Sequence, residues 1–369
     1  TFLTNEQGDS VKIIDFIPRI KSGEINESPP LICRIVEPVK GTVRMSVRLR
    51  PCRNEGKDKL TAKYSADTIL YESTGGDLAL KTSLPADDVL QETVFNLDQT
   101  HYFIFGESKA FSHETISHHC KGFLEQTKQW WREYIRGLKI PDAYNEEITS
   151  AVIALKLCTF EKTGAIVAAL TTSIPEAPGS VRNWDYRYCW LRDALFVIST
   201  LSGLGDHQLR TRYKNFIFQI LEDSGIDAIQ PLYGIHRETD ITEKCSENLS
   251  GYRGTRPVRF GNQAYEQQQN DVWGAIILSL CDLFSSSEHT TTSKIEDFKC
   301  LERLGEHALE KWDQPDAGIW EFRSFGRPHT FSAVMCWAAI DRLSKIAGTL
   351  QIPDRSAFWR RQANEIRKN

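Results

Sequence analysis

Apolar and polar residues alternate along the N-terminal part of the chain with the two-residue period of a half-buried β-strand. In the clearest run, 43–50, Val43, Met45, Val47 and Leu49 alternate with arginine and serine. Such alternation places the apolar side chains on one face of a sheet and the charged ones in water. Turns that contain glycine or proline separate similar runs at 11–17, 31–36, 68–71, 78–82 and 101–105. We expect a β-sandwich over residues 1–110, and an incomplete one because the first strand already begins at Thr1.

The apolar period then changes to three and four, the spacing of one buried helix face. In residues 113–138 this face contains Cys120, Phe123 and Trp130, and Pro141 ends the pattern. Further helices are predicted over 143–161, 190–204, 207–222, 263–284, 294–312, 330–347 and 355–368. We therefore expect a linker helix over 111–142, followed by an all-α domain over 143–369.

Two long connections, 172–189 and 224–262, interrupt the predicted helices. Both are irregular and contain several glycine and proline residues. Loops of this length between packed helices are uncommon and are usually functional. Candidate chemistry is therefore expected in these loops and at the helix ends beside them.

Composition excludes two classes of function. The net charge is −4, from 45 basic and 49 acidic residues, which leaves no basic field to hold a nucleic-acid backbone. No stretch approaches the roughly 18–20 uninterrupted apolar residues of a membrane span. The nine cysteines form no CxxC pair and are odd in number, which favours reduced thiols and a cytoplasmic location. We expect no nucleic-acid partner, no membrane partner and no cofactor.

The segment 180–193, SVRNWDYRYCWLRD, is the densest in residues that could carry chemistry. Four aromatic residues stand among aspartates and arginines where a long loop enters a predicted helix. Aromatic rings cover the C–H face of a sugar, while carboxylates and guanidinium groups bind its hydroxyls. The segment therefore favours carbohydrate binding. The alternative is an arginine–aspartate pair beside an aromatic core with only a structural role, since many ion-pair networks have no other role.

A second segment, 315–323, connects two predicted helices and contains Trp320 and Glu321. An apolar neighbour disfavours the ionised form of a carboxyl group, so a glutamate beside a tryptophan suits a general acid. The alternative is an ordinary surface glutamate.

Two other groups of residues point to no site. The loop 251–262 is rich in glycine and arginine but matches neither GxGxxG nor a P-loop, which argues against nucleotide binding. His118, His119 and Cys120 are metal-ligand types. Consecutive helix positions point in different directions, however, so we expect no metal site there.

Three stretches, taken together, resemble glycoside hydrolase family 15, the inverting glucoamylases, and most closely its bacterial glucoamylase and trehalase-like branch. They are SIPEAPGSVRNWDYRYCWLRDA, GYRGTRPVRFGN with the following QQQNDVWG, and PDAGIWEFR running on to HTFSAVMCWAAIDR. Their order and spacing fit the family. The strand-rich N-terminal region also resembles the β-sandwich of that branch, so the resemblance covers essentially the whole chain.

The resemblance implies an (α/α)6 toroid, of which residues 143–369 would be the N-terminal part. It implies that Glu321, in the family's WE pair, is the general acid that protonates the glycosidic oxygen. It also implies substrate-binding residues at the WxRD, DY and WE motifs and, less directly, in the QQQND stretch: Trp190, Arg192, Asp193, Asp185, Tyr186, Trp320, Gln269 and Asp271.

The sequence departs from the family at two points. Phe322 stands where the fungal glucoamylases have a second glutamate, so their contacts to the leaving-group sugar do not carry over. Inversion also needs a second carboxylate as a base, about 6.5–9.5 Å from the acid. In the family this glutamate lies beyond the helices predicted here. We therefore expect a fragment, truncated at both ends, that lacks the general base.

The expected function is an inverting, exo-acting hydrolase that releases glucose from α-glucans or trehalose, with an α-glucoside or oligosaccharide as its partner. Two alternatives stay open: a non-catalytic sugar-binding protein on the same fold, and another (α/α)6 enzyme such as a phosphorylase. The sequence indicates no oligomeric state.

Overall fold

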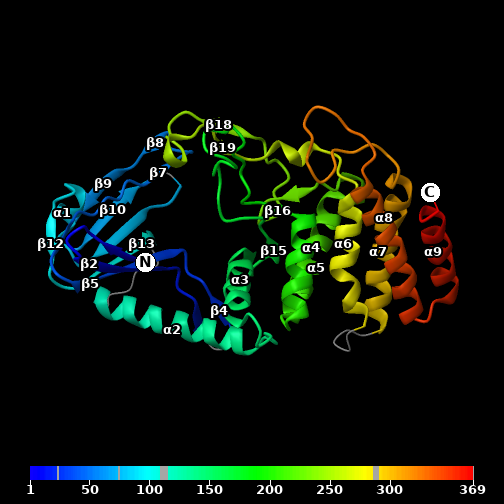
Figure 1. Ribbon diagram of the computed structural model, residues 1–369, viewed down its shortest axis with the longest axis horizontal. Helices are drawn as coiled ribbons and strands as arrows, with labels where there is room; N and C mark the ends of the chain where they lie inside the picture. The colour runs from blue at the N-terminus through cyan, green and yellow to red at the C-terminus, as the bar shows by residue number, and fades with distance from the viewer. Residues whose placement is uncertain (23–24, 74, 109–114, 286–290, 369) are drawn as a thin grey trace. The chain divides into compact units, whose positions relative to one another are not determined.

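A computed structural model describes residues 1–22, 25–73, 75–108, 115–285 and 291–368. The chain forms two compact units, Thr1–Arg136 and Gly137–Asn369. The first is built on a β-sheet and the second mainly on helices (Figure 1). The predicted order of a strand-rich region followed by helices is confirmed.

The first unit contains an antiparallel sheet of seven strands. The predicted runs at 11–17, 31–36, 68–71, 78–82 and 101–105 correspond to five of them. In spatial order the strands are β1 (Phe2–Thr4), β2 (Ser10–Phe16), β5 (Leu31–Lys40), β13 (His101–Glu107), β11 (Leu78–Thr82), β10 (Thr68–Glu72) and β9 (Thr61–Tyr64). Three small two-stranded sheets accompany the large one: β3 (Ile20–Ser22) with β4 (Ile25–Glu27), β6 (Val43–Met45) with β12 (Phe95–Leu97), and β7 (Cys52–Arg53) with β8 (Asp58–Lys59).

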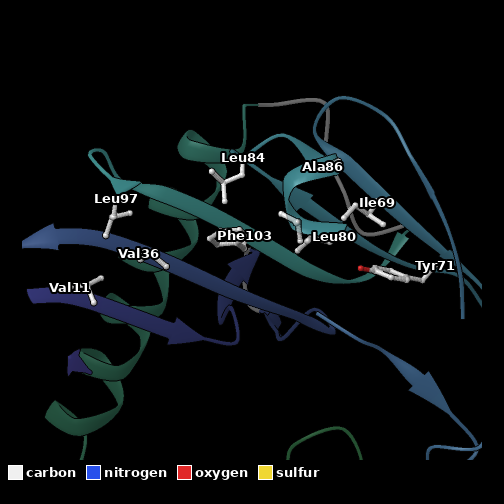
Figure 2. Close-up of a cluster of buried hydrophobic side chains, with 10 residues drawn as sticks. Val11, Val36, Ile69, Tyr71, Leu80, Leu84, Ala86, Leu97 and Phe103 are labelled. Atoms are coloured by element: carbon white, nitrogen blue, oxygen red, sulfur yellow. The ribbon is translucent and has the colours of Figure 1, made fainter. Parts of the chain in front are cut away.

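One face of the large sheet packs against the short helix α1 (Ala86–Leu90) and the two-stranded β6–β12 sheet. Val36 of β5 and Phe103 of β13 belong to the buried cluster on this side (Figure 2). The predicted strand over 43–50 is shorter than expected, since β6 ends at Met45. The apolar residues that follow β6, Val47 and Leu49, still pack against the cluster. Their alternation with polar residues therefore reflects burial on one side and not pairing with a neighbouring strand.

The helix predicted as a linker covers the opposite face of the sheet. In α2 (Ile116–Arg136), Cys120 and Phe123 pack against Cys33 of β5. The linker assignment is therefore corrected: the apolar stripe that predicted the helix also binds it to the sheet, and the unit extends to Arg136. The predicted boundary at residue 110 falls in 109–114, which lies outside the described residues. The expected sandwich is one large sheet, with α2 on one side and a small second layer on the other.

The second unit consists of helices whose apolar faces pack on one another. They are α3 (Asn145–Leu157), α4 (Leu191–Gly203), α5 (His207–Ser224), α6 (Asp271–Leu280), α7 (Thr291–Lys311), α8 (Thr330–Thr349) and α9 (Pro353–Ile366). Figure 1 shows α4 to α9 lying side by side. Helix α6 packs on both α4 and α8, while α5 packs on α4 and α9 packs on α8.

Short elements join these helices. The two-stranded pieces are β14 (Thr159–Phe160) with β15 (Ala165–Ile166), β16 (Cys189–Trp190) with β17 (Leu232–Tyr233), and β18 (Lys244–Ser246) with β19 (Val258–Phe260). The 3₁₀ turns are η2 (Ile226–Ala228), η3 (Tyr252–Gly254), η4 (Gln263–Glu266) and η5 (Cys281–Phe284). The single helix predicted over 263–284 is thus wrong, because η4, an irregular stretch, α6 and η5 replace it.

Helix α6 is the centre of the second unit. Nine of its ten residues are buried, as expected of a helix that is apolar on all sides and surrounded by others. Its first residue, Asp271, differs from the apolar residues around it because it is a carboxylate that is completely buried. In the part of the chain that the structure describes, no helix is long and apolar enough to cross a membrane.

Candidate functional site

A cavity of about 900 Å³ lies in the second unit, and Glu321 lines it together with Trp190, Arg192 and Asp193. Its walls come from the two long loops that the sequence singled out and from the connection between α7 and α8. Three segments that are far apart in the chain therefore meet at one place.

The start of α4 forms one wall of this cavity. Trp190 ends β16, which pairs with β17 and so fixes how the chain enters α4. Trp190 is 2% exposed and Arg192 is 8% exposed. Asp193 follows in the first helical turn, where an acidic side chain interacts favourably with the helix dipole.

One carboxylate oxygen of Glu321 accepts three N–H groups. Trp190 Nε1 donates to Oε1 at 2.6 Å, Arg192 Nη2 at 3.1 Å and Gln269 Nε2 at 3.2 Å. Among the described residues, none donates a hydrogen bond to the other oxygen, Oε2. Glu321 thus has one oxygen that the protein holds and one that is available to a bound molecule.

Arg192 connects Glu321 to a second, buried carboxylate. Its Nη1 donates to Gln269 Oε1 at 2.9 Å and lies 3.3 Å from Asp271 Oδ2. Burial raises the pKa of the Asp271 carboxyl, and the charge of Arg192 opposes that effect. A guanidinium group is well suited to this place because its planar fork serves several acceptors at once.

The loop that carries Glu321 is closed at its base and strained at its tip. Asp316 and Arg327 exchange backbone hydrogen bonds of 3.0 and 3.1 Å. Gly318 has a φ of +65°, and a Cβ there would lie 2.6 Å from the ring of His329. Glu321 itself has a φ of 54°, a left-handed conformation that is uncommon for residues other than glycine and that clusters at functional sites.

A rim of aromatic and charged residues extends the cavity beyond Glu321. The guanidinium groups of Arg259 and Arg323 lie 4.6 and 4.2 Å from the ring centre of Trp184. Glu243 binds Arg323 through both of its oxygens and lies 3.3 Å from Arg259. Trp184 Nε1 donates to Glu176 at 3.2 Å, so this rim ties both long loops to the connection that carries Glu321.

The structure brings together most of the predicted site residues. Trp190, Arg192, Asp193, Tyr186 and Glu321 all line the same cavity. Asp193 Oδ2 lies 3.7 Å from Arg192 Nε, and the rings of Tyr186 and Trp190 lie 6.0 Å apart. Burial raises the pKa of the Tyr186 phenol, which keeps it a neutral hydroxyl at neutral pH.

Three predicted residues lie otherwise than expected. Asp185 is fully buried, and its carboxylate accepts two hydrogen bonds from the Arg187 side chain, so it is not placed to touch a substrate. Asp271 lies behind Arg192 and does not line the cavity. Trp320 lines the cavity but is 76% exposed. The WE pair suggested an apolar neighbour for the Glu321 carboxylate, but its closest contact is the N–H group of Trp190.

Sequence reasoning missed several residues that hold the site. Gln267 donates to the backbone oxygen of Glu321 at 3.3 Å. Asp316 accepts from the backbone of Asn270, and Glu243 binds Arg323. Asp316 lies inside the PDAGIWEFR stretch, which was a usable signal. Glu243 lies in a long loop with no distinctive pattern around it. Gln269, only a secondary candidate, contacts both Arg192 and Glu321.

The site combines the accessible Oε2 of the Glu321 carboxylate with fixed donors and aromatic surface, which suits proton transfer to a neutral polar molecule such as a sugar. Within the described ranges, no group of three histidine, cysteine, aspartate or glutamate side chains is arranged to hold a metal ion.

Comparison with known proteins finds relatives that are named trehalases. The trehalase of Thermoplasma volcanium is 28% identical over 365 residues, covering 97% of this chain and 57% of that protein. The trehalase of Mycobacterium tuberculosis is 38% identical over 248 residues, covering 66% of this chain and 36% of that protein. The matched residues therefore span little more than half of the first relative and about a third of the second.

A solved structure shares the fold. The crystal structure of a bacterial glucoamylase complexed with acarbose superposes with a TM-score of 0.62 at 12% identity, covering all of this chain and 56% of that chain. The model of the family "Glycosyl hydrolases family 15" matches residues 142–369, which contain every residue that lines the cavity. This chain belongs to glycosyl hydrolase family 15.

Proposed function

We propose that this chain carries the acid half of the active site of an inverting, exo-acting α-glucoside hydrolase. The observation that carries the proposal is the placement of Glu321 within 3.1 Å of Arg192, in one cavity with Trp190 and Asp193. Had Glu321 lain far from Arg192 and Asp193, the proposal would have failed. The names of the relatives make trehalose the first substrate to test, with maltose and longer α-glucans next.

In this proposal Glu321 protonates the glycosidic oxygen from Oε2, the oxygen that accepts no hydrogen bond from the described residues. The three donors on Oε1 stabilise the carboxylate that forms as the proton leaves. They are already in place before the reaction, so no reorganisation is needed when charge develops. Asp193 and Arg192 bind hydroxyl groups of the terminal glucose, and the ring of Tyr186 lies near the reacting centre.

The second carboxylate is proposed to come from outside residues 1–369. Inversion needs a base about 6.5–9.5 Å from the acid, with room for a water between them. Two other carboxylates line the cavity. Glu176 is hydrogen-bonded to Arg182 and Trp184, and Asp193 is assigned to substrate hydroxyls. Neither is left to activate water. We therefore propose that an (α/α)6 toroid, of which this chain provides part, is completed by the segment that supplies the base.

The test is Glu321→Gln in the enzyme that contains this chain, assayed with trehalose, maltose and α-glucosyl fluoride. We expect kcat for the two disaccharides to fall about 10²–10⁴-fold, because a positioned acid contributes that much. Turnover of the fluoride should fall far less, because fluoride leaves with little protonation. Substrate binding should survive.

Glu306→Gln, an exposed position on α7, is the control and should not change either activity. NMR of the first-formed glucose from α-glucosyl fluoride should show the β anomer, the mark of inversion, and trehalose should give equal amounts of α- and β-glucose, because its leaving glucose keeps the α configuration. Retention of more than about a tenth of kcat on the disaccharides by Glu321→Gln would reject the acid assignment. Release of α-glucose from the fluoride, or of α-glucose alone from trehalose, would reject inversion.

A further inference from the structure

Asp316 lies five residues before Glu321 and does not line the cavity, yet its buried carboxylate joins the connection between α7 and α8 to other elements. It is 3% exposed. Its Oδ2 accepts the backbone N–H of Asn270 at 2.8 Å and the hydroxyl of Ser332 at 2.7 Å. Asn270 directly precedes α6, and Ser332 lies in the first turn of α8. One oxygen therefore joins the loop to the beginnings of two helices.

The contacts of Asn270 extend this junction to the end of α7. Its side-chain Nδ2 donates to the backbone oxygens of Lys311 and Gln314, at 3.1 and 3.2 Å. The backbone N–H of Ala317 donates to the oxygen of Gln268 at 2.9 Å. The loop that carries Glu321 is thus aligned, residue against residue, with the 267–271 stretch.

That stretch supplies one of the three donors to the Glu321 carboxylate and contacts a second. Gln269 donates to Glu321 Oε1, and Asp271 contacts Arg192, which donates to the same oxygen. Asp316 therefore connects the backbone on which Glu321 stands with the side chains that orient its carboxylate. Any movement at Asp316 changes the distance between them.

The junction is costly to keep. The second oxygen of Asp316, Oδ1, is buried and has no hydrogen-bond partner among the described residues, and the same is true of Asp271 Oδ1. Burying an unpartnered carboxylate oxygen costs free energy of folding, and such groups in native proteins call for an explanation. Proton transfer supplies one, because it requires heavy atoms held within about 2.6–3.2 Å, and a shift of 1 Å can cost about 10²-fold in rate.

We infer that Asp316 is a positioning residue for Glu321: through Asn270 and Ser332 it sets where the acid stands relative to the glycosidic oxygen. The inference rests on the proposed role of Glu321. It predicts a specific defect, since a displaced acid harms only reactions that need the leaving group protonated.

The experiment uses Ser332→Ala and Asp316→Asn in the enzyme that contains this chain. Ser332→Ala removes one hydrogen bond to Asp316 and leaves its carboxylate intact. Ser344→Ala is the matched control. It lies on the same helix, is equally buried, and loses one hydrogen bond, to the backbone oxygen of Ser356, away from the cavity. Circular dichroism checks that each variant is folded.

We expect both test variants to lower kcat on the disaccharide substrate about 10–100-fold, with KM within about threefold of the parent value. Turnover of α-glucosyl fluoride should change less than about threefold, because its leaving group needs little help from an acid. Ser344→Ala should leave both activities unchanged.

Two results would overturn the inference. One is an equal loss on both substrates in Ser332→Ala, which would indicate general damage to the site. The other is unchanged disaccharide turnover in both test variants. These outcomes are separate from a failure of the proposed function, which Glu321→Gln decides alone. If that variant loses disaccharide turnover selectively and neither Ser332→Ala nor Asp316→Asn does, only the positioning role is wrong.

Discussion

Arg192 is the residue on which both the chemistry and the stability of the site depend. It reaches Glu321, Gln269 and Asp271 from the first turn of α4. Asp271 is fully buried, and removing one partner of a buried ion pair leaves a charge that protein and water cannot compensate. The same side chain thus orients the acid and offsets the cost of a carboxylate behind it.

We predict that Arg192→Met lowers the free energy of unfolding by about 3–5 kcal/mol at neutral pH, measured by urea denaturation. The loss should be smaller in acid. Burial raises the pKa of Asp271 above its ordinary 3.8, and loss of Arg192 should raise it further. A folded-state pKa that is raised favours the folded protein at low pH, and this contribution disappears as pH rises through it. Asp271 can therefore take up a proton in the variant.

The control for this prediction is Arg303→Met, at an exposed position of α7, where we expect a change below about 0.5 kcal/mol. An equal loss of stability at pH 4 and pH 7 in Arg192→Met would contradict the explanation through Asp271.

At the scale of single residues, sequence patterns predicted which side chains suit the site better than they predicted where those side chains lie. Glu321, Arg192 and Trp190 could be selected because their side-chain types suit sugar chemistry. Asp185 and Asp193 lie in the same motif and carry the same group, yet one pairs with Arg187 in the interior and the other lines the cavity. Which way each carboxylate turns depends on partners from distant segments, such as the backbone N–H of Gly261, which donates to Asp185. No local pattern encodes that.

At the scale of elements, α6 packs closely against the backbone of α8 at Gly274. A Cβ built on Gly274 would lie 2.3 Å from the backbone oxygen of Met335 on α8. Backbone atoms cannot move aside as a flexible side chain can. The absence of a side chain here lets two helices pack at a distance that any other residue would forbid.

Gly274→Ala should therefore destabilise the second unit by about 1–3 kcal/mol, through overpacking, although alanine favours helix formation more than glycine does. Gly203→Ala is the matched control. It stands in α4, where an added Cβ meets nothing within 4 Å, and it should be neutral or stabilising by up to about 1 kcal/mol. Thermal and urea denaturation measure both. A neutral Gly274→Ala would show that α6 and α8 can separate at little cost.

Elements were predictable wherever burial was one-sided. Strands β2, β5, β10, β11 and β13 of the large sheet and helices α4, α5, α8 and α9 each carry an apolar face with a clear period. The helix predicted over 263–284 failed because α6 is apolar on every side, so periodicity could not show where it begins. Its start at Asp271 is set instead by tertiary bonds, in which Asn270 binds Asp316 and the end of α7. For α2 the period predicted the helix but not its partner.

For the whole molecule, topology lay beyond sequence patterns. The central pairing of the sheet joins β5 to β13, although β5 ends at Lys40 and β13 begins only at His101. The cavity likewise joins segments near residues 184, 259 and 323. Such contacts follow from the summed burial of many side chains and not from any one run. Only the resemblance to a family, carried by three motifs in order, anticipated that these segments meet.

Acid stability is also a property of the whole molecule, since every carboxylate whose pKa changes on folding contributes to it. Glu243 is the carboxylate that joins the long 224–262 loop to the loop of Glu321. Burial alone would raise its pKa, but the hydrogen bonds and charge of Arg323, with the charge of Arg259, hold the pKa below the ordinary 4.5. A lowered folded-state pKa contributes stability above the unfolded value, and that contribution is lost as pH falls through the folded one.

Glu243→Gln should therefore reduce the free energy of unfolding at pH 7 but flatten its decline in acid. Parent and variant should differ most above pH 4.5 and converge as the pH falls below it, because Glu243 becomes neutral in the parent as well. Urea denaturation from pH 7 to pH 3 measures both curves, with Glu306→Gln as the exposed control. Parallel curves for Glu243→Gln and the parent would mean that the ion pairs of Glu243 do not stabilise the fold. The loops around the cavity would then be held chiefly by buried contacts, such as the hydrogen bonds from Asn270 and Ser332 to Asp316.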